Sequence, residues 1–351
     1  MGKKISFRAK LSIITFVLIA LILYLTRHEL VHAWNLLQQV NIWLLLLVFP
    51  ASAISYLAGG EMIFSYLRQK GFVKDVSPLT LMRISLELNF VNHAFPSGGV
   101  SGISYTNWRL GKYGISNGRA TMAQIVRYAM GFVALVVFLA VAMIWVTADG
   151  AVNRWIILMS AILVGATLAV SFAGMFFLDS KRRLAKASQY LTSFVNTFGR
   201  RVLRRKKPLL RDGVVLGFFD DMHEDFMELK QDKKLLIKPF VWGLVFVIME
   251  IVPFWMTFKA LGVDVNPASI LIGYGAAIVT GFFFATPGGA GAYEAVMVAV
   301  LTISGVGQGQ AIAGTVLYRV IALLTTLVLG YVFYQLTILK YGRQPTSHPR
   351  S

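Results

Sequence analysis

Long apolar runs separated by short polar segments make up most of this sequence. A helix needs about 20 apolar residues to cross a bilayer, and six runs are close to that length or exceed it. They lie at residues 11–26, 40–66, 120–147, 155–178, 237–261 and 310–338. The pattern predicts an all-α polytopic membrane protein with six full transmembrane helices.

Two further apolar segments, 78–108 and 268–305, are each interrupted by a stretch rich in proline and glycine. The first contains FPSGG, and the arm after this break is too short and polar to cross alone. The second contains FFFATPGGAGAYEA, and its first arm is long enough to span. We expect two re-entrant hairpins that enter and leave by the same side. The alternative is eight or nine membrane helices, with the second hairpin as two full spans.

Basic residues are distributed unevenly around the six predicted spans. With the N-terminus inside, 28 of the 34 Lys and Arg residues lie on the inner side, and Arg27, Arg154 and Lys259 lie outside. Cytoplasmic loops of membrane proteins are enriched in Lys and Arg. We therefore expect a multi-pass protein of the cell membrane with both termini in the cytoplasm.

Composition narrows the function classes. Charged residues make up 14% of the chain, whereas soluble domains carry about 25%. The net charge of +18 then favours anionic lipid headgroups as partners rather than nucleic acid. The absence of cysteine excludes disulfides, thiolate catalysis and cysteine-based metal sites. We expect no cofactor.

The predicted spans divide the chain into two membrane halves and a loop. We expect a first half, 1–178, a cytoplasmic loop, 179–236, a second half, 237–340, and a cytoplasmic tail, 341–351. The first part of the loop alternates basic and apolar residues at helical spacing, which predicts a helix on the membrane surface. Its second part contains DDMHED, Asp220 to Asp225, which we interpret as a solvated acidic helical turn that balances the basic part, rather than as a metal site.

The two interrupted segments resemble each other. Each is followed by a span with an arginine about one-third of the way along; 31 residues separate Pro96 from Arg127, and 32 separate Pro287 from Arg319. Three full spans lie between the hairpins, so the second unit is expected to be inverted relative to the first. Entering from opposite faces, both arginines then reach towards the midplane.

The breaks are candidate sites for an anionic headgroup. Non-helical backbone at membrane depth must be buried in protein or line a wet cavity. A helix that restarts after a break offers free N–H groups, and glycine lets a phosphate approach them closely. The predicted headgroup-binding residues are Ser97, Gly98, Gly99, Arg127, Pro287, Gly288, Gly289, Gly291 and Arg319.

Ionisable residues inside the membrane are candidates for gating or proton coupling. Glu294 lies about a turn into the second arm of its hairpin. An unpaired carboxylate there costs several kcal/mol, so we expect Arg319 as its partner. The pair either fixes helix packing or gates the site. Glu250, whose partner the sequence does not identify, and His93 are the other candidates.

The first hairpin carries additional polar residues. Arg83 and Glu87 are four residues apart, which predicts a local ion pair. Asn89, Asn92 and His93 lie roughly along one stripe, which is consistent with a polar cavity lining. With one histidine and no matching set of ligands, we expect neither a metal site nor a catalytic site there.

Two motifs resemble a known family. TPGGAGAYEA, followed by YRVIALLTTLVLG, resembles the signature of the lysylphosphatidylglycerol synthase transmembrane-domain family, also described as flippase-like. FPSGGVSGISYTNWRLGKYGIS, followed by RATMAQIVRY, resembles its first-half motif. The resemblance runs from the first span to residue 338 and implies a lipid-translocating domain. The residues carried over from the motif are Pro287, Gly288, Gly289, Gly291, Glu294 and Arg319.

Full synthases of that family perform aminoacyl transfer in a separate soluble C-terminal domain. Here only a few residues follow the last span before Ser351, so we expect no lysyltransferase activity. The leading hypothesis is a flippase for an anionic or polyprenyl-phosphate lipid held near the midplane. The alternatives are a membrane-embedded lipid-phosphate transferase, with Glu294 or His93 as acid or base, and an accessory subunit that docks a separate lipid-modifying enzyme. The sequence leaves the oligomeric state open.

Overall fold

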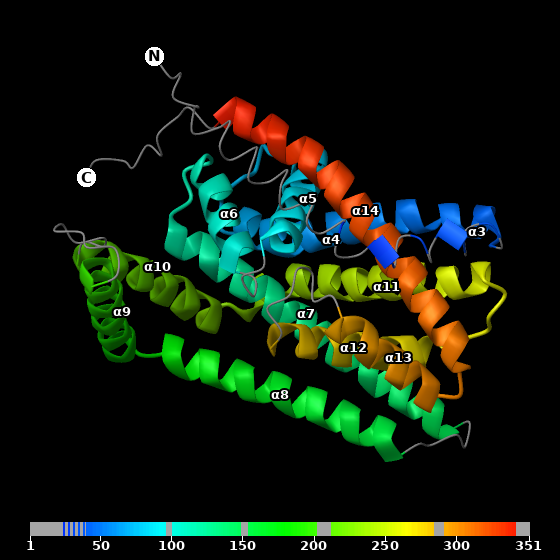
Figure 1. The fold of residues 1–351 in the computed structure, drawn as a ribbon. Coiled ribbons are helices and arrows are strands. Elements are labelled where there is room, and N and C mark those ends of the chain that lie inside the picture. The colour runs from blue at the N-terminus through cyan, green and yellow to red at the C-terminus, as the bar shows by residue number, and fades with distance from the viewer. Residues whose placement is uncertain are drawn as a thin grey trace.

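The computed structural model describes residues 24, 27–28, 31, 34–35, 38, 40–95, 100–148, 154–201, 212–283 and 291–341. Every regular element in these ranges is a helix, and the helices form an elongated bundle (Figure 1). In chain order they are α3 (Ile42–Leu46), α4 (Val48–Gln69), α5 (Pro78–Ala94), α6 (Val100–Gly111), α7 (Asn117–Ala148), α8 (Arg154–Leu178), α9 (Lys181–Arg201), α10 (Asp212–Gln231), the short 3-10 helix η1 (Lys233–Leu236), α11 (Ile237–Ala260), α12 (Pro267–Phe283), α13 (Ala292–Ile303) and α14 (Gln308–Tyr341). The predicted all-helical class is confirmed for the described ranges.

Within the described residues, four helical stretches are long and apolar enough to cross a membrane. They are Ile42–Gln69, Asn117–Ala142, Lys233–Ala260 and Gln308–Tyr341. These coincide with four of the six predicted spans. The predicted span 155–178 forms the helix α8, and the predicted span 11–26 lies almost wholly outside the described residues.

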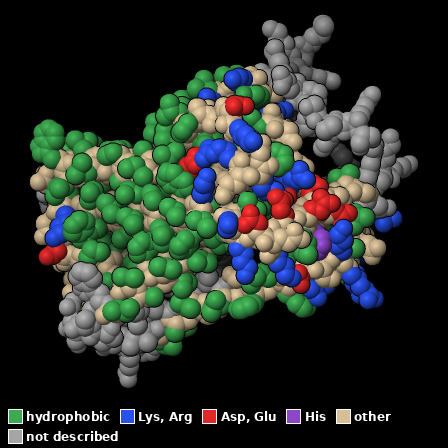
Figure 2. Space-filling view, turned by 180° about the vertical axis from the view of Figure 1, so that it is seen from behind, with side chains coloured by type: hydrophobic (Ala, Val, Ile, Leu, Met, Phe, Trp, Pro, Cys, Tyr) green, Lys and Arg blue, Asp and Glu red, His purple; other side chains and the backbone are tan. Residues whose placement is uncertain are grey.

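The surface is also that of a membrane protein. Hydrophobic side chains cover most of the face in Figure 2, whereas charged side chains gather at the end of the bundle that carries α9 and α10. Large apolar side chains are exposed along α7, α8 and α14, including Val141, Phe172, Phe177, Val328 and Leu339. Exposed apolar surface of this extent is typical of contact with lipid.

Two units of the chain contain the same elements in the same order. The first unit is α4–α7 and the second is α11–α14. The paired helices α5 and α12 both have 17 residues, and α6 and α13 both have 12. At 1.5 Å per residue, a 17-residue helix is about 26 Å long, which is shorter than the roughly 30 Å hydrocarbon core. The described arms of both hairpins are therefore shorter than the hydrocarbon core, as expected for re-entrant segments.

The turns inside the two units match as well, at positions 191 residues apart. A glycine with positive φ ends α4, α6, α11 and α13, and the next N–H donates to the carbonyl five residues back, at 2.9 to 3.3 Å. These glycines are Gly71, Gly114, Gly262 and Gly305, with φ between 71° and 93°. Only glycine adopts this conformation without strain, so the sequence itself encodes the repeat.

The first arm of each hairpin begins with the same capping signal. Asp-Val-Ser-Pro precedes α5 and Asp-Val-Asn-Pro precedes α12, with proline as the first helical residue in both. The Ser77 hydroxyl accepts from the Thr80 N–H at 3.3 Å, and the Asn266 amide oxygen accepts from the Ala268 N–H at 2.9 Å. Such caps satisfy backbone donors that the first turn leaves free.

The second unit runs in the opposite direction to the first. In Figure 1 α4 and α11 point in opposite directions, and so do α7 and α14. The contacts between units are reciprocal: α4 packs on α11, α5 of the first unit packs on α14 of the second, and α12 of the second packs on α7 of the first. This exchange is the pattern expected of two inverted units related by a pseudo-twofold axis beside α4 and α11.

The helices α9 and α10 lie outside the two units, at what we call the α10 end. Along α9, Tyr190, Leu191, Phe194 and Phe198 are exposed between basic residues. The helices α9 and α10 contact each other, and α10 also contacts the start of α7. A Cβ atom added at Gly118 of α7 would lie 2.4 Å from the Asp221 Cβ and 2.5 Å from the Phe218 carbonyl oxygen.

The acidic segment Asp220 to Asp225 is helical, as predicted, but the prediction that it is solvated was wrong for His223 and Asp225, which are buried. Asp225 is 1% exposed, accepts a hydrogen bond from Lys70 and lies 3.6 Å from the Arg119 Nε. Burial raises the pKa of Asp225, while the hydrogen bond and charge of Lys70 oppose that rise. The His223 Nδ1 lies 2.7 Å from the Leu178 carbonyl oxygen. Helix α10 is thus docked on the ends of α4, α7 and α8.

Replacing Gly118 by alanine should loosen this docking, because the new methyl group meets α10 backbone. We expect a loss of about 1–3 kcal/mol of stability, as for an overpacked core, seen as a lower thermal midpoint of the purified protein. Gly217→Ala in α10 is the matched control, since nothing lies within 4 Å of its added Cβ. Equal midpoints for the two variants would show that α10 is not held at Gly118.

Candidate functional site

Glu250 lies in the middle of α11, the helix of the second unit that packs on α4. The Ser55 hydroxyl of α4 donates to its Oε1 at 2.5 Å, and Tyr274 of α12 interacts with it electrostatically. Arg127 of α7 and Arg319 of α14 both act on Glu250 electrostatically. Residues of both units therefore surround Glu250, and the sequence did not identify these partners. We call Glu250, Arg127 and Arg319 the central site.

Arg319 forms the ion pair predicted from the sequence. Its Nε lies 2.7 Å from Glu294 Oε1, and the two side chains are 18% and 14% exposed. The Arg319 guanidinium carbon also lies 4.2 Å from the centroid of the Tyr293 ring. The pairing is confirmed, whereas a gating role for it stays a prediction.

The other oxygen of Glu294 caps α13. Glu294 Oε2 accepts from the Gly291 N–H at 2.6 Å, and Gly291 has φ 87°. The acidic side chain thus occupies the positive end of the helix that we expected to hold a headgroup. In this conformation the Glu294 carboxylate already occupies the N-terminus of α13. A phosphate that binds there must therefore displace this carboxylate or share the Gly291 N–H with it.

Arg127 is placed differently from Arg319. It is half-buried, and its Nη2 lies against Gly59 of α4, 3.3 Å from where a Cβ would stand. Among the residues that the structure describes, no hydrogen bond or ion pair is formed by its guanidinium, which lies 5.9 Å from the centroid of the Tyr128 ring. Arg127 is therefore the available cation of the central site.

The two arginines are not strictly equivalent. When the units are aligned through their glycine turns, 191 residues apart, Arg127 corresponds to Tyr318 and Tyr128 corresponds to Arg319. A shift of one residue turns a helical side chain by about 100°. The exchange of Arg and Tyr explains why Arg319 meets Glu294, whereas Arg127 faces α4.

Sequence reasoning missed the tyrosines around Glu250. Tyr274, Tyr293 and Tyr318 are buried, with exposed fractions of 7%, 8% and 8%, and each interacts electrostatically with Glu250. The Tyr318 and Phe254 rings contact each other at a tilt of 49°, with centroids 4.3 Å apart. Tyrosine in the middle of an otherwise apolar span is the signal that would have found them, because its hydroxyl needs a partner when buried.

The predicted lining residues of the first hairpin make local contacts. The His93 Nδ1 lies 2.8 Å from the Asn89 carbonyl oxygen, and the Asn89 amide donates to the Ser85 carbonyl at 3.0 Å. Asn92 accepts from the Gly102 N–H at 3.0 Å and so ties the two arms together. Arg319 acts on His93 electrostatically, which places His93 at the edge of the central site.

Six predicted headgroup residues fall on the two breaks themselves. The following six lie outside the described residues: Ser97, Gly98, Gly99, Pro287, Gly288 and Gly289. Gly291 is the one member of the second break that is described, and its N–H is already bonded to Glu294. A headgroup role for the breaks remains a prediction.

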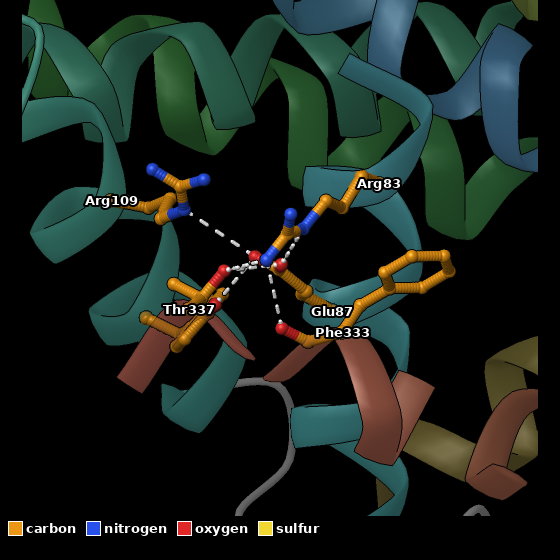
Figure 3. A network of polar contacts seen from close by, with 6 residues as sticks. Arg83, Glu87, Arg109, Phe333 and Thr337 are labelled. Atoms are coloured by element: carbon orange, nitrogen blue, oxygen red, sulfur yellow. Dashed lines mark hydrogen bonds and ion pairs between the residues drawn. The ribbon is translucent and has the colours of Figure 1, made fainter. Parts of the chain in front are cut away.

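A second polar cluster joins the first hairpin to α14 (Figure 3). Glu87 is fully buried; its Oε1 accepts from the Arg83 Nε at 2.8 Å and from the Thr337 hydroxyl at 2.6 Å. Arg83 also donates to the Phe333 carbonyl at 3.2 Å and to the Thr337 hydroxyl at 2.7 Å. The predicted Arg83–Glu87 pair is confirmed, and it belongs to a network that the sequence did not reveal.

An apolar pocket of about 670 Å³ lies at the end opposite α10, between α7, α11 and α12. Its lining includes Phe138, Ile251, Trp255 and Leu271. Within the described residues, no group of three His, Asp or Glu side chains could hold a metal ion.

Comparison with known proteins gives one match. The family model described as "Lysylphosphatidylglycerol synthase TM region" matches residues 11–330. Neither the curated proteins nor the solved structures include a significant match.

The Glu294–Arg319 pair can be tested by charge removal. Glu294→Gln removes the carboxylate that is bonded to Arg319 in a largely buried place, so we expect a loss of about 2–4 kcal/mol of stability. The double variant Glu294→Gln/Arg319→Gln should recover part of this loss, because no charge is left unpaired. Thermal unfolding of the purified proteins measures both.

The exposed pair Lys230–Asp179 is the matched control. Its Nζ and Oδ1 atoms lie 2.6 Å apart, close to the 2.7 Å of the Glu294–Arg319 pair, but its side chains are 54% and 43% exposed. The hydrogen bond and charge of Lys230 lower the pKa of Asp179, yet solvent screens such a pair. Asp179→Asn should therefore have a much smaller effect than Glu294→Gln, and equal effects would contradict a buried role for the Arg319 pair.

Proposed function

Because the chain belongs to the lysylphosphatidylglycerol synthase TM region family, we propose that it moves an anionic phospholipid or a polyprenyl-phosphate-linked lipid across the cytoplasmic membrane. One observation carries the proposal: two arginines, on helices that run in opposite directions, flank a single carboxylate inside the bundle. Transporters of inverted design hold their substrate where the two repeats meet.

The membrane topology follows from the charges and the fold together. We assign the α10 end to the cytoplasm, with both termini there, since 28 of the 34 Lys and Arg residues belong to segments at that side. Residues 11–26 and α8 then complete six spans, and the two hairpins enter from opposite faces. The charged end in Figure 2 supports this assignment.

The headgroup phosphate is received by Arg127, a cation beside Glu250 that has no bonded anion among the described residues. Arginine suits this role because its planar guanidinium matches phosphate oxygens in two-point geometry. As the phosphate approaches α13, it competes with the Glu294 carboxylate for Arg319 and for the Gly291 N–H. Release of Glu294 uncaps α13, which couples headgroup binding to movement of the second hairpin.

The lipid tails stay in or beside the bilayer during this transfer. The pocket between α7, α11 and α12 is lined mainly by apolar side chains, and it lies on the helix that carries Glu250. The two units then rock about the α4–α11 contact, which exposes the central site to one side at a time. Glu250, Glu294 and His93 are the groups through which protons would couple to this motion.

Transport is tested in proteoliposomes with fluorescent phosphatidylglycerol and a fluorescent polyprenyl-phosphate analogue. Wild-type protein should move at least one of them faster than protein-free vesicles. Arg127→Gln should slow that movement by about tenfold or more, since it removes the charge-assisted hydrogen bond that Arg127 would donate to the headgroup phosphate. Arg182→Gln, which removes the same charge at an exposed position of α9, is the control.

Movement of neither lipid by folded wild-type protein would contradict the proposal. Equal loss in Arg127→Gln and Arg182→Gln would show that only net charge matters and that Arg127 has no special place.

A further inference from the structure

The Glu87 network at the α10 end contains more positive than negative charge. Glu87 Oε1 is used by Arg83 and Thr337, and Oε2 accepts from the Tyr105 hydroxyl at 2.7 Å and from the Arg109 Nε at 3.4 Å. Two guanidinium groups thus share one carboxylate, whose oxygens are already saturated. A charge of about +1 is left over.

The excess charge belongs to Arg109. Its side chain is 3% exposed, its only ion-pair contact is the long one to Glu87, and its Nη1 is buried without a hydrogen-bond partner in the described part of the chain. In Figure 3 the two terminal nitrogens of Arg109 point away from Glu87. A buried guanidinium nitrogen without an acceptor costs free energy, so this arrangement fits an anion on the far side of Arg109.

The helices around Arg109 offer no other carboxylate. Apart from Glu87, the sequences of α5, α6, α7 and α14 contain no acidic residue. Basic residues are present nearby: Lys112 Nζ lies 5.6 Å from the centroid of the Trp108 ring, and Lys340 Nζ lies 5.2 Å from that of Tyr341. The countercharge for Arg109 must therefore come from outside these helices.

The position suits a headgroup at the membrane interface. Arg109 is in the last turn of α6, and Tyr341, whose ring centroid lies 4.8 Å from the Arg109 guanidinium carbon, is the last residue of α14. Both helices end at the α10 end. Aromatic and basic side chains together at a helix end are typical of the headgroup layer.

The Arg109 guanidinium carbon also lies 5.9 Å from the centroid of the Tyr113 ring. We infer that Arg109, between Tyr113 and Tyr341, is the centre of a second anion site that binds a phosphate group. The site is distinct from Arg127 and Arg319 in the middle of the bundle. Its assignment to a lipid of the inner leaflet rests on the proposed orientation, whereas binding itself does not require transport. A lipid phosphodiester and a soluble phosphate share the chemistry that Arg109 recognises, and the experiment separates them.

Binding is measured by native mass spectrometry of the purified full chain in detergent, titrated with phosphatidylglycerol, with diacylglycerol as the phosphate-free lipid. The measurement is made in an Arg127→Gln background, which removes the available cation of the central site. We expect phosphatidylglycerol to bind and diacylglycerol not to bind. Adding Arg109→Gln should weaken binding by about tenfold, whereas Arg109→Lys should retain part of it and the Arg182→Gln control all of it.

The reverse change gives the sharper test. Glu87→Gln removes the competing carboxylate, raises the local charge and should tighten phosphatidylglycerol binding several-fold. A merely structural Arg109–Glu87 pair predicts the opposite, because both single variants would then weaken binding through loss of folding. If Arg109→Gln misfolds, Glu87→Gln still decides between the two.

Competition with glycerol 3-phosphate identifies the source of the anion. Displacement of the lipid at comparable concentration assigns the site to soluble phosphates, and no displacement assigns it to lipid. Unchanged binding in Arg109→Gln, or weaker binding in Glu87→Gln, overturns the inference. Loss of transport with Arg109-dependent binding intact contradicts only the proposed function, and intact transport without such binding contradicts only this site.

Discussion

A charge or a free backbone group inside a bilayer must find a partner within the protein, because lipid supplies none. This constraint organises the described structure. Glu294 satisfies it twice, by pairing with Arg319 and by capping α13. Glu87 satisfies it with four donors. Arg127 and Arg109 satisfy it least, and these are the two positions at which we propose that an anion binds.

The inverted repeat explains why such charges can meet. Each unit alone has two short hairpin arms and two long helices, and the last of these carries an arginine. Packing α5 on α14 and α12 on α7 lets each unit cover the short hairpin of the other. Close contacts depend on glycine: a Cβ at Gly330 of α14 would lie 2.4 Å from the Phe90 Cβ of α5. Through these reciprocal contacts the two units pack together around the α4–α11 pair.

Features that depend on local sequence could be predicted. Features that depend on contacts between helices distant in the sequence could not. The two hairpins and the Glu294–Arg319 pair follow from breaks, spacing and the cost of an unpaired charge. The burial of Asp225 could not be read from DDMHED, since it depends on Lys70 and Arg119 from distant segments. The tyrosines around Glu250 and the surplus charge of Arg109 likewise arise only when several helices meet. The one-residue offset between Arg127 and Arg319 became visible only when the two units were aligned through their glycine turns.

The most direct test of this account is the side from which the two arginine-bearing helices enter the membrane. The chain contains no cysteine, so single cysteines can be placed at Ser116 and Gly307, exposed positions just before α7 and α14. We predict that a membrane-impermeant maleimide added outside intact cells labels Gly307→Cys and leaves Ser116→Cys unlabelled until the membrane is opened. Labelling of both from the same side would contradict the inverted arrangement, and with it the meeting of Arg127 and Arg319 at one central site.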